Sequence, residues 1–313
     1  TYTVEDTIVF SNATRGGYTI VWDRNGIVEG TTGNITVHAI NTEKTLVQCY
    51  NNGVYEIWTF NQLIQLHDQP NGGNGRTYRV MNNIRCPLTN YHWIAIPEFK
   101  GTLDGNGYLI SNFELDESSG GNIGLVGINS GTIKKLTIAT KYDVSTDYSN
   151  VNVGSFAGIN KGTITECATE TLFNRYIFTC YAAGVSYAGG FVGINEGTIS
   201  SCTGGDSMIG SCNMGTIAGK NAGTISNCHG GNGVTQIDYL YRSYNASVGG
   251  IVGLQTAGKV ENCSFQGRIV WSSVYYSENY DSWYEDREMQ PCIGIMIGYK
   301  QGGSITGSSW ELG

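Results

Sequence analysis

Charged residues are scarce in this chain. Lys, Arg, Asp and Glu make up 14% of the 313 residues, whereas 45 residues are glycine and 20 are tyrosine. This composition argues against a disordered or largely helical chain and favours a turn-rich β protein with a hydroxylated surface. The formal net charge of -8 argues against a nucleic acid or an anionic membrane as partner.

Long apolar segments are also missing. No run of about 18 apolar residues occurs, so we expect no membrane-spanning helix and no membrane insertion. No signal peptide opens the chain. Because Thr1 is not an initiator methionine, we expect a mature or excised fragment of a larger or processed protein.

The motifs of several enzyme classes are absent. None of the four histidines begins a His-Glu-x-x-His zinc motif, and there is no Gly-x-Ser-x-Gly elbow and no Walker loop. Cys-x-x-Cys spacing is absent too, so we expect no metal and no cofactor. A non-catalytic protein is therefore favoured. The paired carboxylates of a glycan-active enzyme stay open, because Asp and Glu are scattered through the chain.

What the sequence does contain is a repeat. One copy reads Gly190-Phe-Val-Gly193-Ile-Asn195-Glu-Gly197-Thr-Ile199-Ser-Ser-Cys202. Other copies lie at 124–136, 154–167, 217–228 and 250–263, and a degraded copy lies at 294–308. A unit of this length cannot bury its own apolar face, so each unit must stack on the next.

The unit can be interpreted residue by residue. Val192 and Ile194 are two residues apart, which predicts that both face one side of a strand. The Asn195–Gly197 segment is typical of a turn, with glycine supplying a positive φ. Ile199 is expected inside the next short strand, and the two polar residues before Cys202 indicate a corner. Short strands joined by tight corners predict an all-β fold, a right-handed parallel β-helix with inward Ile, Val and Cys ladders.

The repeat resembles the GLUG motif of bacterial secreted and surface proteins. The segments 55–66, 75–80 and 94–112 extend the resemblance upstream, so that it covers roughly residues 54 to 309. The chain is similar to the β-helical regions of IgA-specific metallopeptidases and of adhesin-like proteins. The resemblance implies an extracellular or cell-surface location in bacteria, but fold alone does not define an activity.

The first 53 residues do not resemble the repeat. Short β-type runs at 7–10, 18–22, 26–29, 35–38 and 45–50 predict an N-terminal β-strand subdomain or cap (1–53) before the β-helix (54–313). Asn25-Gly26 and Asn51-Asn52-Gly53 are hairpin signals. Thr59-Phe-Asn-Gln62 has capping-box spacing and predicts a short capping helix over 60–67.

Cysteines recur at one position of the repeat. Cys167, Cys202, Cys228 and Cys263 are predicted to form a buried stack of reduced thiols, since parallel Cβ directions disfavour disulfides. The segment Asp104-Gly-Asn-Gly107 looks like part of a calcium loop but lacks the distal ligands, so a turn is favoured.

Tyrosine-rich segments of unequal length separate the copies. Variable insertions in a repeat protein gather on one face, often the binding face. Aromatic side chains beside carboxylates and amides suit sugar rings. The predicted binding residues are Tyr239, Tyr241, Tyr244, Tyr275, Tyr276, Tyr280, Trp283 and Tyr284.

Three functions fit this pattern. The favoured one is a non-catalytic extracellular binding or adhesion module that presents an aromatic face to a glycan or a partner protein. The first alternative is a glycan-active β-helix lyase or hydrolase. The second is a structural stalk or filament element that self-associates through its coil ends.

Overall fold

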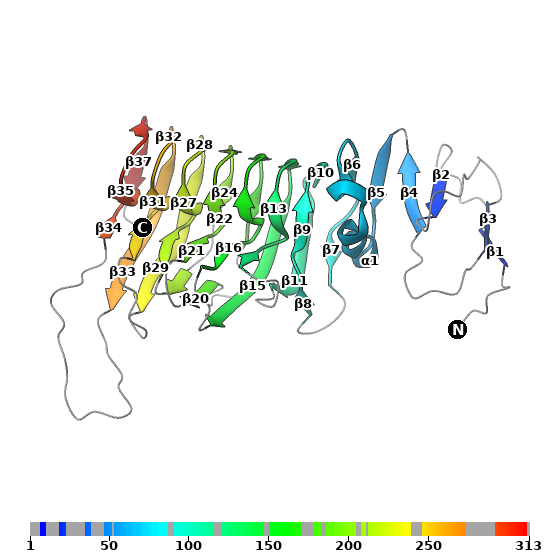
Figure 1. Ribbon diagram of the computed structural model, residues 1–313, viewed down its shortest axis with the longest axis horizontal. Coiled ribbons are helices and arrows are strands. Elements are labelled where there is room, and N and C mark those ends of the chain that lie inside the picture. Colours follow the sequence, from blue (N-terminus) through cyan, green and yellow to red (C-terminus); the bar gives the residue numbers. More distant parts are fainter. Residues whose placement is uncertain are drawn as a thin grey trace, which may run out of the picture.

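The chain winds into a stack of coils. The computed structural model describes residues 7–10, 19–22, 35–38, 47–51, 53–86, 91–115, 121–146, 150–170, 178–182, 186–204, 208–210, 212–238, 246–272 and 292–311. Four sheets run along the stack, and in the repeat region neighbouring strands of each sheet are parallel (Figure 1). This arrangement confirms the predicted parallel β-helix.

Each full coil passes through four sheets, here named I to IV in the order of the chain. Sheet I comprises β2 (Thr19–Trp22), β4 (Val47–Asn51), β5 (Val54–Ile57), β6 (Thr77–Val80), β10 (Thr102–Asp104), β14 (Thr132–Lys134), β18 (Thr163–Thr165), β23 (Thr198–Ser200), β28 (Thr224–Ser226), β32 (Lys259–Glu261) and β36 (Ser304–Thr306). Sheet II comprises β7 (Ile84–Arg85), β8 (His92–Trp93), β11 (Leu109–Leu115), β15 (Thr137–Thr146), β19 (Ala168–Thr169), β20 (Phe178–Ala182), β24 (Thr203–Gly204), β25 (Met208–Gly210), β29 (His229–Asp238), β33 (Ser264–Ser272) and β37 (Ser309–Glu311).

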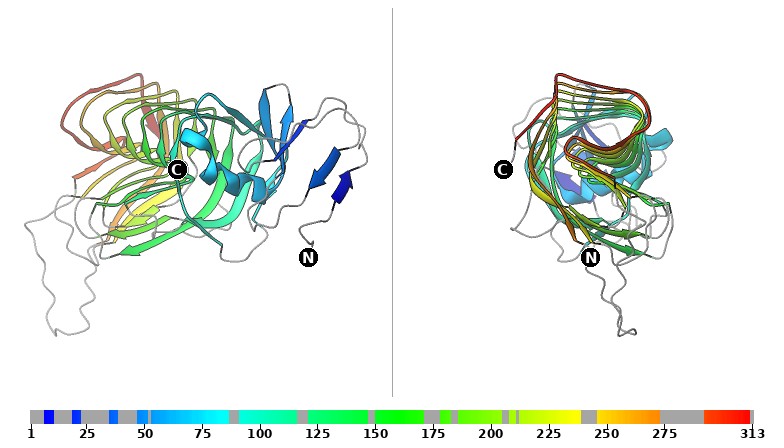
Figure 2. Two further views of the ribbon diagram at one scale, coloured as in Figure 1. Left: turned by 45° about the vertical axis from the view of Figure 1, so that its right-hand side comes forward. Right: turned by 90° about the vertical axis from the view of Figure 1, so that its left-hand side faces the viewer.

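The other two sheets follow. Sheet III comprises β12 (Asn122–Ile123), β16 (Asn152–Gly154), β21 (Tyr187–Gly189), β26 (Asn213–Gly215), β30 (Ser247–Gly249) and β34 (Cys292–Gly294). Sheet IV comprises β9 (Ile96–Phe99), β13 (Val126–Asn129), β17 (Ala157–Asn160), β22 (Val192–Asn195), β27 (Ala218–Asn221), β31 (Val252–Gln255) and β35 (Ile297–Lys300). Viewed along the long axis, successive coils overlay one another closely (Figure 2, right).

The first strands are antiparallel. β1 (Thr7–Phe10) pairs with β3 (Ile35–His38), and β2 pairs with β4. β4 and β5 form an antiparallel hairpin in which Asn51 pairs with Val54, as the Asn-Asn-Gly signal predicted. Sheet I therefore continues from β4 into the β-helix. The predicted strand 26–29 and the Asn25-Gly26 hairpin lie outside the described residues.

A short helix closes the first coil, as predicted. α1 (Phe60–Ile64) is followed by two 3₁₀ turns, η1 (Gln65–Asp68) and η2 (Pro70–Gly73). Thr59 and Gln62 form the capping box: the Gln62 amide donates to Thr59 Oγ1, and the Thr59 amide donates to Gln62 Oε1. Leu63 and Leu66 are 0% and 2% exposed, so the helical segment covers the coil interior with apolar side chains. The second half of the predicted helix is thus 3₁₀ rather than α.

The central residue of each sheet I strand fills the core. Ile133, Ile164, Ile199, Ile225 and Val260 follow one another in register, and each is fully buried. A parallel register places such residues about 4.8 Å apart, which gives a continuous aliphatic ladder. This predicted ladder is confirmed.

The prediction for Ile194 is wrong. Val192 is buried in β22, but Ile194 is only half-buried, and Asn195 is the residue with no exposed surface. The strand therefore does not alternate strictly, because both Phe191 and Val192 enter the core at its start. An amide occupies the interior position that the pattern assigned to an aliphatic side chain.

The predicted role of Gly197 is also wrong. The positive φ of the repeat lies at Ser201, with φ 54°, at the corner before the buried cysteine. Gly197 is needed for a different reason, since a Cβ there would lie 2.2 Å from the carbonyl oxygen of Gly162 in the preceding coil. Gly193 likewise allows sheet IV to approach sheet III, because its Cβ would lie 2.4 Å from the Val153 nitrogen. Glycine here permits backbone contact between coils.

Candidate functional site

All of the predicted binding residues lie outside the described residues. They are Tyr239, Tyr241, Tyr244, Tyr275, Tyr276, Tyr280, Trp283 and Tyr284. The strands that flank their two segments are described, however, and these strands fix where each segment leaves the β-helix and where it returns.

The two aromatic segments start and end side by side. The first leaves β29 after Asp238, and the second leaves β33 after Ser272, and these two residues are paired in the parallel register. The segments return at β30 and β34, where Ser247 is paired with Cys292. Paired residues in neighbouring strands lie about 5 Å apart. The ends of both segments are therefore anchored next to each other.

Two shorter segments leave from the same edge. β15 and β20 belong to sheet II and are paired up to Thr146 and Ala182, and the chain re-enters sheet III at β16 and β21. The ends of β15, β29 and β33 point to one edge of the ribbon in Figure 1. The chain thus crosses from sheet II to sheet III through segments of unequal length, and the two aromatic segments are the longest of these. We treat this edge as the candidate functional site.

The coil interior contains an amide ladder that sequence analysis missed. Each side-chain Nδ2 donates to the side-chain oxygen of the next coil, at 2.8, 2.8, 2.8 and 2.9 Å, along Asn129, Asn160, Asn195, Asn221 and Gln255. All five residues are fully buried. The signal in the sequence was an Asn or Gln at one position of five copies, at the end of a strand with buried residues. Its role is structural, because no surface of it reaches solvent.

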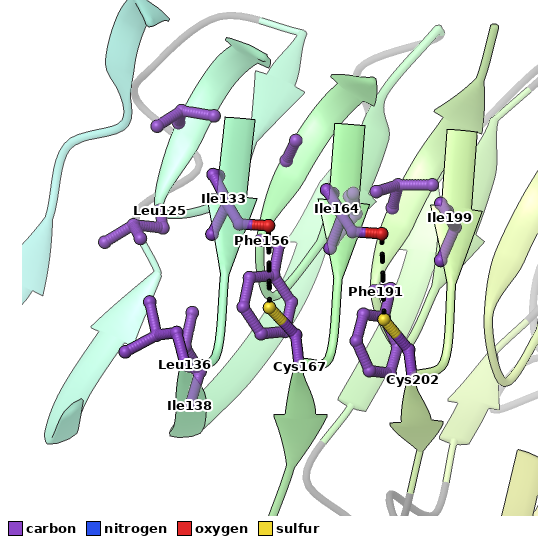
Figure 3. Packing of buried hydrophobic residues seen from close by; sticks show 14 of the residues in the cluster. Leu125, Ile133, Leu136, Ile138, Phe156, Ile164, Cys167, Phe191, Ile199 and Cys202 are labelled. Atoms are coloured by element: carbon purple, nitrogen blue, oxygen red, sulfur yellow. Dashed lines mark hydrogen bonds between the residues drawn. The ribbon is translucent and has the colours of Figure 1, made fainter. Parts of the chain in front are cut away.

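The predicted thiol stack is confirmed. Cys167, Cys202, Cys228 and Cys263 are free and buried. Each Sγ donates to a carbonyl oxygen of its own coil at 3.2 Å, and Figure 3 shows the longer contacts of Cys167 and Cys202 to the preceding coil. The neighbouring Cys202 thiol and burial together raise the pKa of Cys228 to about 12. Protonated, enclosed thiols are poor nucleophiles, so the stack is core rather than a reactive site.

Cys202 and Cys263 follow the same trend. A hydrogen bond with the Cys167 thiol raises the pKa of Cys202, and one with the Cys228 thiol raises that of Cys263, with burial adding to both. Phe156 and Phe191 stack beside this column with ring centroids 4.9 Å apart (Figure 3). Off the ladder, Cys212 is buried as well.

The Asp104–Gly107 segment forms a turn, as predicted. Asn106 and Gly107 have positive φ, and the Asn106 amide donates to Asp104 Oδ1 at 3.0 Å. Asp104 Oδ2 lies 3.4 Å from Arg79 and 3.7 Å from Lys134. Its carboxylate is therefore neutralised by two side chains of neighbouring strands. Across the part of the chain that the structure describes, no three His, Cys, Asp or Glu side chains are grouped to hold a metal ion.

Two other surface features have part of what a site needs. A shallow depression of about 290 Å³ lies beside α1 and is lined by Trp58, Thr59, Phe60, Asn61, Asn83, Ile84 and Arg85. Ligand pockets of this size enclose most of a small molecule, and this one is too open to do so. On sheet II, His229 Nδ1 lies 2.8 Å from Ser264 Oγ. The pair has no carboxylate partner among the described residues, so it lacks the third member of a catalytic triad.

The outer face of sheet I is hydroxylated. Its outward positions in the central coils carry threonine or serine, and Ser200 Oγ donates to Thr165 Oγ1 at 2.9 Å. This face agrees with the predicted outward Thr and Ser.

Comparisons with known proteins agree with the GLUG resemblance. The family model of the GLUG motif matches residues 244–270, which include the copy in β31 and β32. The chain is 33% identical over 124 residues to Halomucin of Haloquadratum walsbyi (strain DSM 16790 / HBSQ001). That match covers 35% of this chain and 1% of Halomucin, so the chain spans a very small part of that relative.

One solved structure aligns with most of this chain. The crystal structure of a Bacteroides ovatus protein assigned as an immunoglobulin A1 protease aligns with a TM-score of 0.47 and 16% identity. The alignment covers 80% of this chain and 84% of that chain. Among the described residues of the present chain, no helix is both long and apolar enough to cross a membrane.

Proposed function

We propose that this chain is an extracellular, non-catalytic β-helix module that binds a glycan through the aromatic segments 239–245 and 273–291. The observation that carries the proposal is the pairing of Asp238 with Ser272 and of Ser247 with Cys292. Two segments with neighbouring starts and neighbouring ends are suited to form one continuous surface. The rigid coil stack serves as its support.

The composition of these segments supports a sugar as ligand. They carry the eight aromatic residues of the predicted site together with several Asp and Glu side chains. Aromatic faces stack on the apolar face of a pyranose, while amides donate or accept hydrogen bonds at its edge and carboxylates accept them. The acidic side chains repel a polyanion. The expected ligand is therefore a neutral or cationic glycan rather than a sulfated or uronic-acid polymer.

An extracellular location is part of the proposal. It is supported by the GLUG match at residues 244–270 and by the similarity to Halomucin over 124 residues. The thiol stack is compatible with an oxidising environment, because buried thiols with raised pKa values react slowly with oxidants.

A glycan array with the purified chain tests the proposal. We expect binding to a subset of neutral or amine-bearing glycans and no binding to sulfated ones. A variant with Tyr239→Ala, Tyr244→Ala and Tyr280→Ala should lose that binding while its melting temperature stays the same. Binding to anionic polymers alone, or to no glycan at all, would overturn the glycan assignment. Release of a shortened sugar during incubation would show an enzyme instead.

A further inference from the structure

Tyr187 lies in line with the points where the two aromatic segments return to the β-helix. The first residues of five sheet III strands form one row in register, Asn152, Tyr187, Asn213, Ser247 and Cys292. The aromatic segments return at the strands of Ser247 and Cys292. Neighbouring strands are about 4.8 Å apart, so Tyr187 lies about 10 Å from Ser247 along the stack.

Tyr187 is held at the contact between sheets III and IV. Its side chain is half-buried, and Lys220 Nζ of β27 lies 5.4 Å from the centroid of its ring. Beside the ring the two backbones touch, because a Cβ on Gly219 would lie 2.4 Å from the Ala188 nitrogen. The ring is therefore fixed on the rigid part of the β-helix, so little conformational entropy is lost when a ligand contacts it.

Polar atoms around this ring have unused hydrogen-bonding capacity. Within the part of the chain that the structure describes, the Tyr187 hydroxyl makes no hydrogen bond and the Lys220 ammonium has no carboxylate partner. Asn152 Nδ2 donates to Asn122 Oδ1 at 2.8 Å, whereas Asn152 Oδ1 accepts no hydrogen bond from a described residue. Burial raises the pKa of Tyr187, so water is partly excluded around its hydroxyl. A hydroxyl, an ammonium and an amide oxygen thus offer donors and acceptors beside one aromatic ring.

The surroundings of Lys220 favour a neutral ligand. Its register partners in the neighbouring coils are Ile194 and Leu254, so the cation stands alone in its row. A polyanion would be favoured by several cations in succession, and this row does not supply them. A single ammonium has three donors, which suit the hydroxyl groups of a sugar. The aliphatic neighbours and the ring suit its apolar face.

We propose that Tyr187, Lys220 and Asn152 form a sugar subsite that extends the binding face along the stack. This inference rests on the proposed function. One sugar unit contacts the Tyr187 ring and further units reach the aromatic segments, about 10 Å away along the row. The ligand is therefore an oligosaccharide that lies parallel to the stack axis. The aromatic segments are needed for binding of any length of glycan, and Tyr187 provides the preference for a longer one.

Isothermal titration calorimetry tests the subsite. The probe is the neutral glycan with the highest affinity on the array, prepared as a disaccharide and as a hexasaccharide. The unmodified chain should bind the hexasaccharide about tenfold more tightly. Tyr187→Ala should bind both with one affinity, because the added contact is lost. Tyr187→Phe and Lys220→Met keep the packing, and each should reduce the length preference about threefold. These two variants keep the test valid if Tyr187→Ala does not fold.

A matched control is available on another face. Tyr55 is also half-buried and has a cation beside its ring, with Arg76 Cζ 5.2 Å from the centroid, but it belongs to sheet I. Tyr55→Ala should leave both affinities unchanged. Equal binding of the two probes by the unmodified chain, or a length preference that survives in the Tyr187 variants, overturns the subsite while the proposed function stands. Absence of binding to any glycan overturns the proposed function, and the subsite with it.

Discussion

Asn160 Nδ2 donates a hydrogen bond to Asn195 Oδ1 at 2.8 Å, and neither residue exposes any surface. The same nitrogen lies 3.3 Å from the carbonyl oxygen of Thr198. Each amide therefore joins its own coil to the next through a side-chain and a backbone acceptor. A buried amide without hydrogen-bond partners costs folding free energy. Because a shift of one coil against the next would break these hydrogen bonds, the ladder holds the coils in one register.

Removing one amide from the ladder should destabilise the fold. In Asn195→Leu, Asn160 Nδ2 loses its side-chain acceptor and Asn221 Oδ1 loses its side-chain donor. We expect a loss of about 1–3 kcal/mol in the free energy of unfolding, measured by urea denaturation. Glu196→Ala, at the exposed neighbouring position, should change it by less than about 0.5 kcal/mol. Equal effects of the two substitutions would contradict the ladder.

The two isoleucines of one repeat should respond very differently to an acidic side chain. Ile199→Asp places an unpaired carboxylate in a fully buried ladder, so it should cost more than about 4 kcal/mol or prevent folding. Ile194→Asp lies at a half-buried position and should cost about 1 kcal/mol. Circular dichroism melts of both variants measure this. If Ile194→Asp is the more damaging, the assignment of inward positions is wrong.

These two residues show where sequence analysis succeeded and where it failed. The Thr-Ile-Ser run alternates strictly, so a period of two placed Ile199 in the core correctly. The run before it contains Gly193 and a tight contact between sheets III and IV, so alternation failed at Ile194. The amide at Asn195 was interpreted as a turn residue because asparagine is common in turns. Its burial depends on the neighbouring coils, which a single repeat does not reveal.

Whether a feature could be predicted depends on whether its interactions are local in the sequence. The capping helix was predicted because the Thr59 and Gln62 interaction is local. The aromatic face remains a prediction.

The thiol stack should give the protein a characteristic loss of stability in alkali. The pKa of Cys228 is raised from 9.0 to about 12 in the folded chain, so the folded state holds this proton more tightly than the unfolded state. The protonated Cys228 thiol makes its full contribution to the free energy of unfolding below pH 9. That contribution declines as the pH rises from 9 towards 12, by up to about 1.4 kcal/mol per pH unit. Urea midpoints across this range measure the decline.

A variant isolates that contribution. Cys228→Ala should show a shallower decline above pH 9 than the unmodified chain, although tyrosines and lysines titrate in both. Reductant at pH 7 should leave the stability of the unmodified chain unchanged, since the four ladder thiols are free. A large effect of reductant, or identical pH profiles for the two chains, would show that the thiols do not act as described.

The capping segment should be needed for solubility. Deleting residues 1–67 removes Leu63 and Leu66 from the first coil and leaves β6 as an unpaired edge of sheet I. Exposed edge strands pair between molecules, so we expect aggregation, measured by light scattering. Thr59→Ala, which removes only the capping box, should cost about 1 kcal/mol and keep the chain soluble. A soluble, monomeric truncation would show that the cap is dispensable.

The most direct test of the proposed function is a double-mutant cycle on glycan affinity. With a glycan selected by the array, Tyr241→Ala and Trp283→Ala should each weaken binding by about 1–2 kcal/mol, measured by isothermal titration calorimetry. Because their segments are anchored side by side, the two effects should deviate from additivity by about 0.5 kcal/mol or more. Tyr148→Ala, in a segment several coils away, should leave the affinity unchanged. Unchanged binding in both Tyr241→Ala and Trp283→Ala would contradict the account, because the binding face would then lie elsewhere on the β-helix.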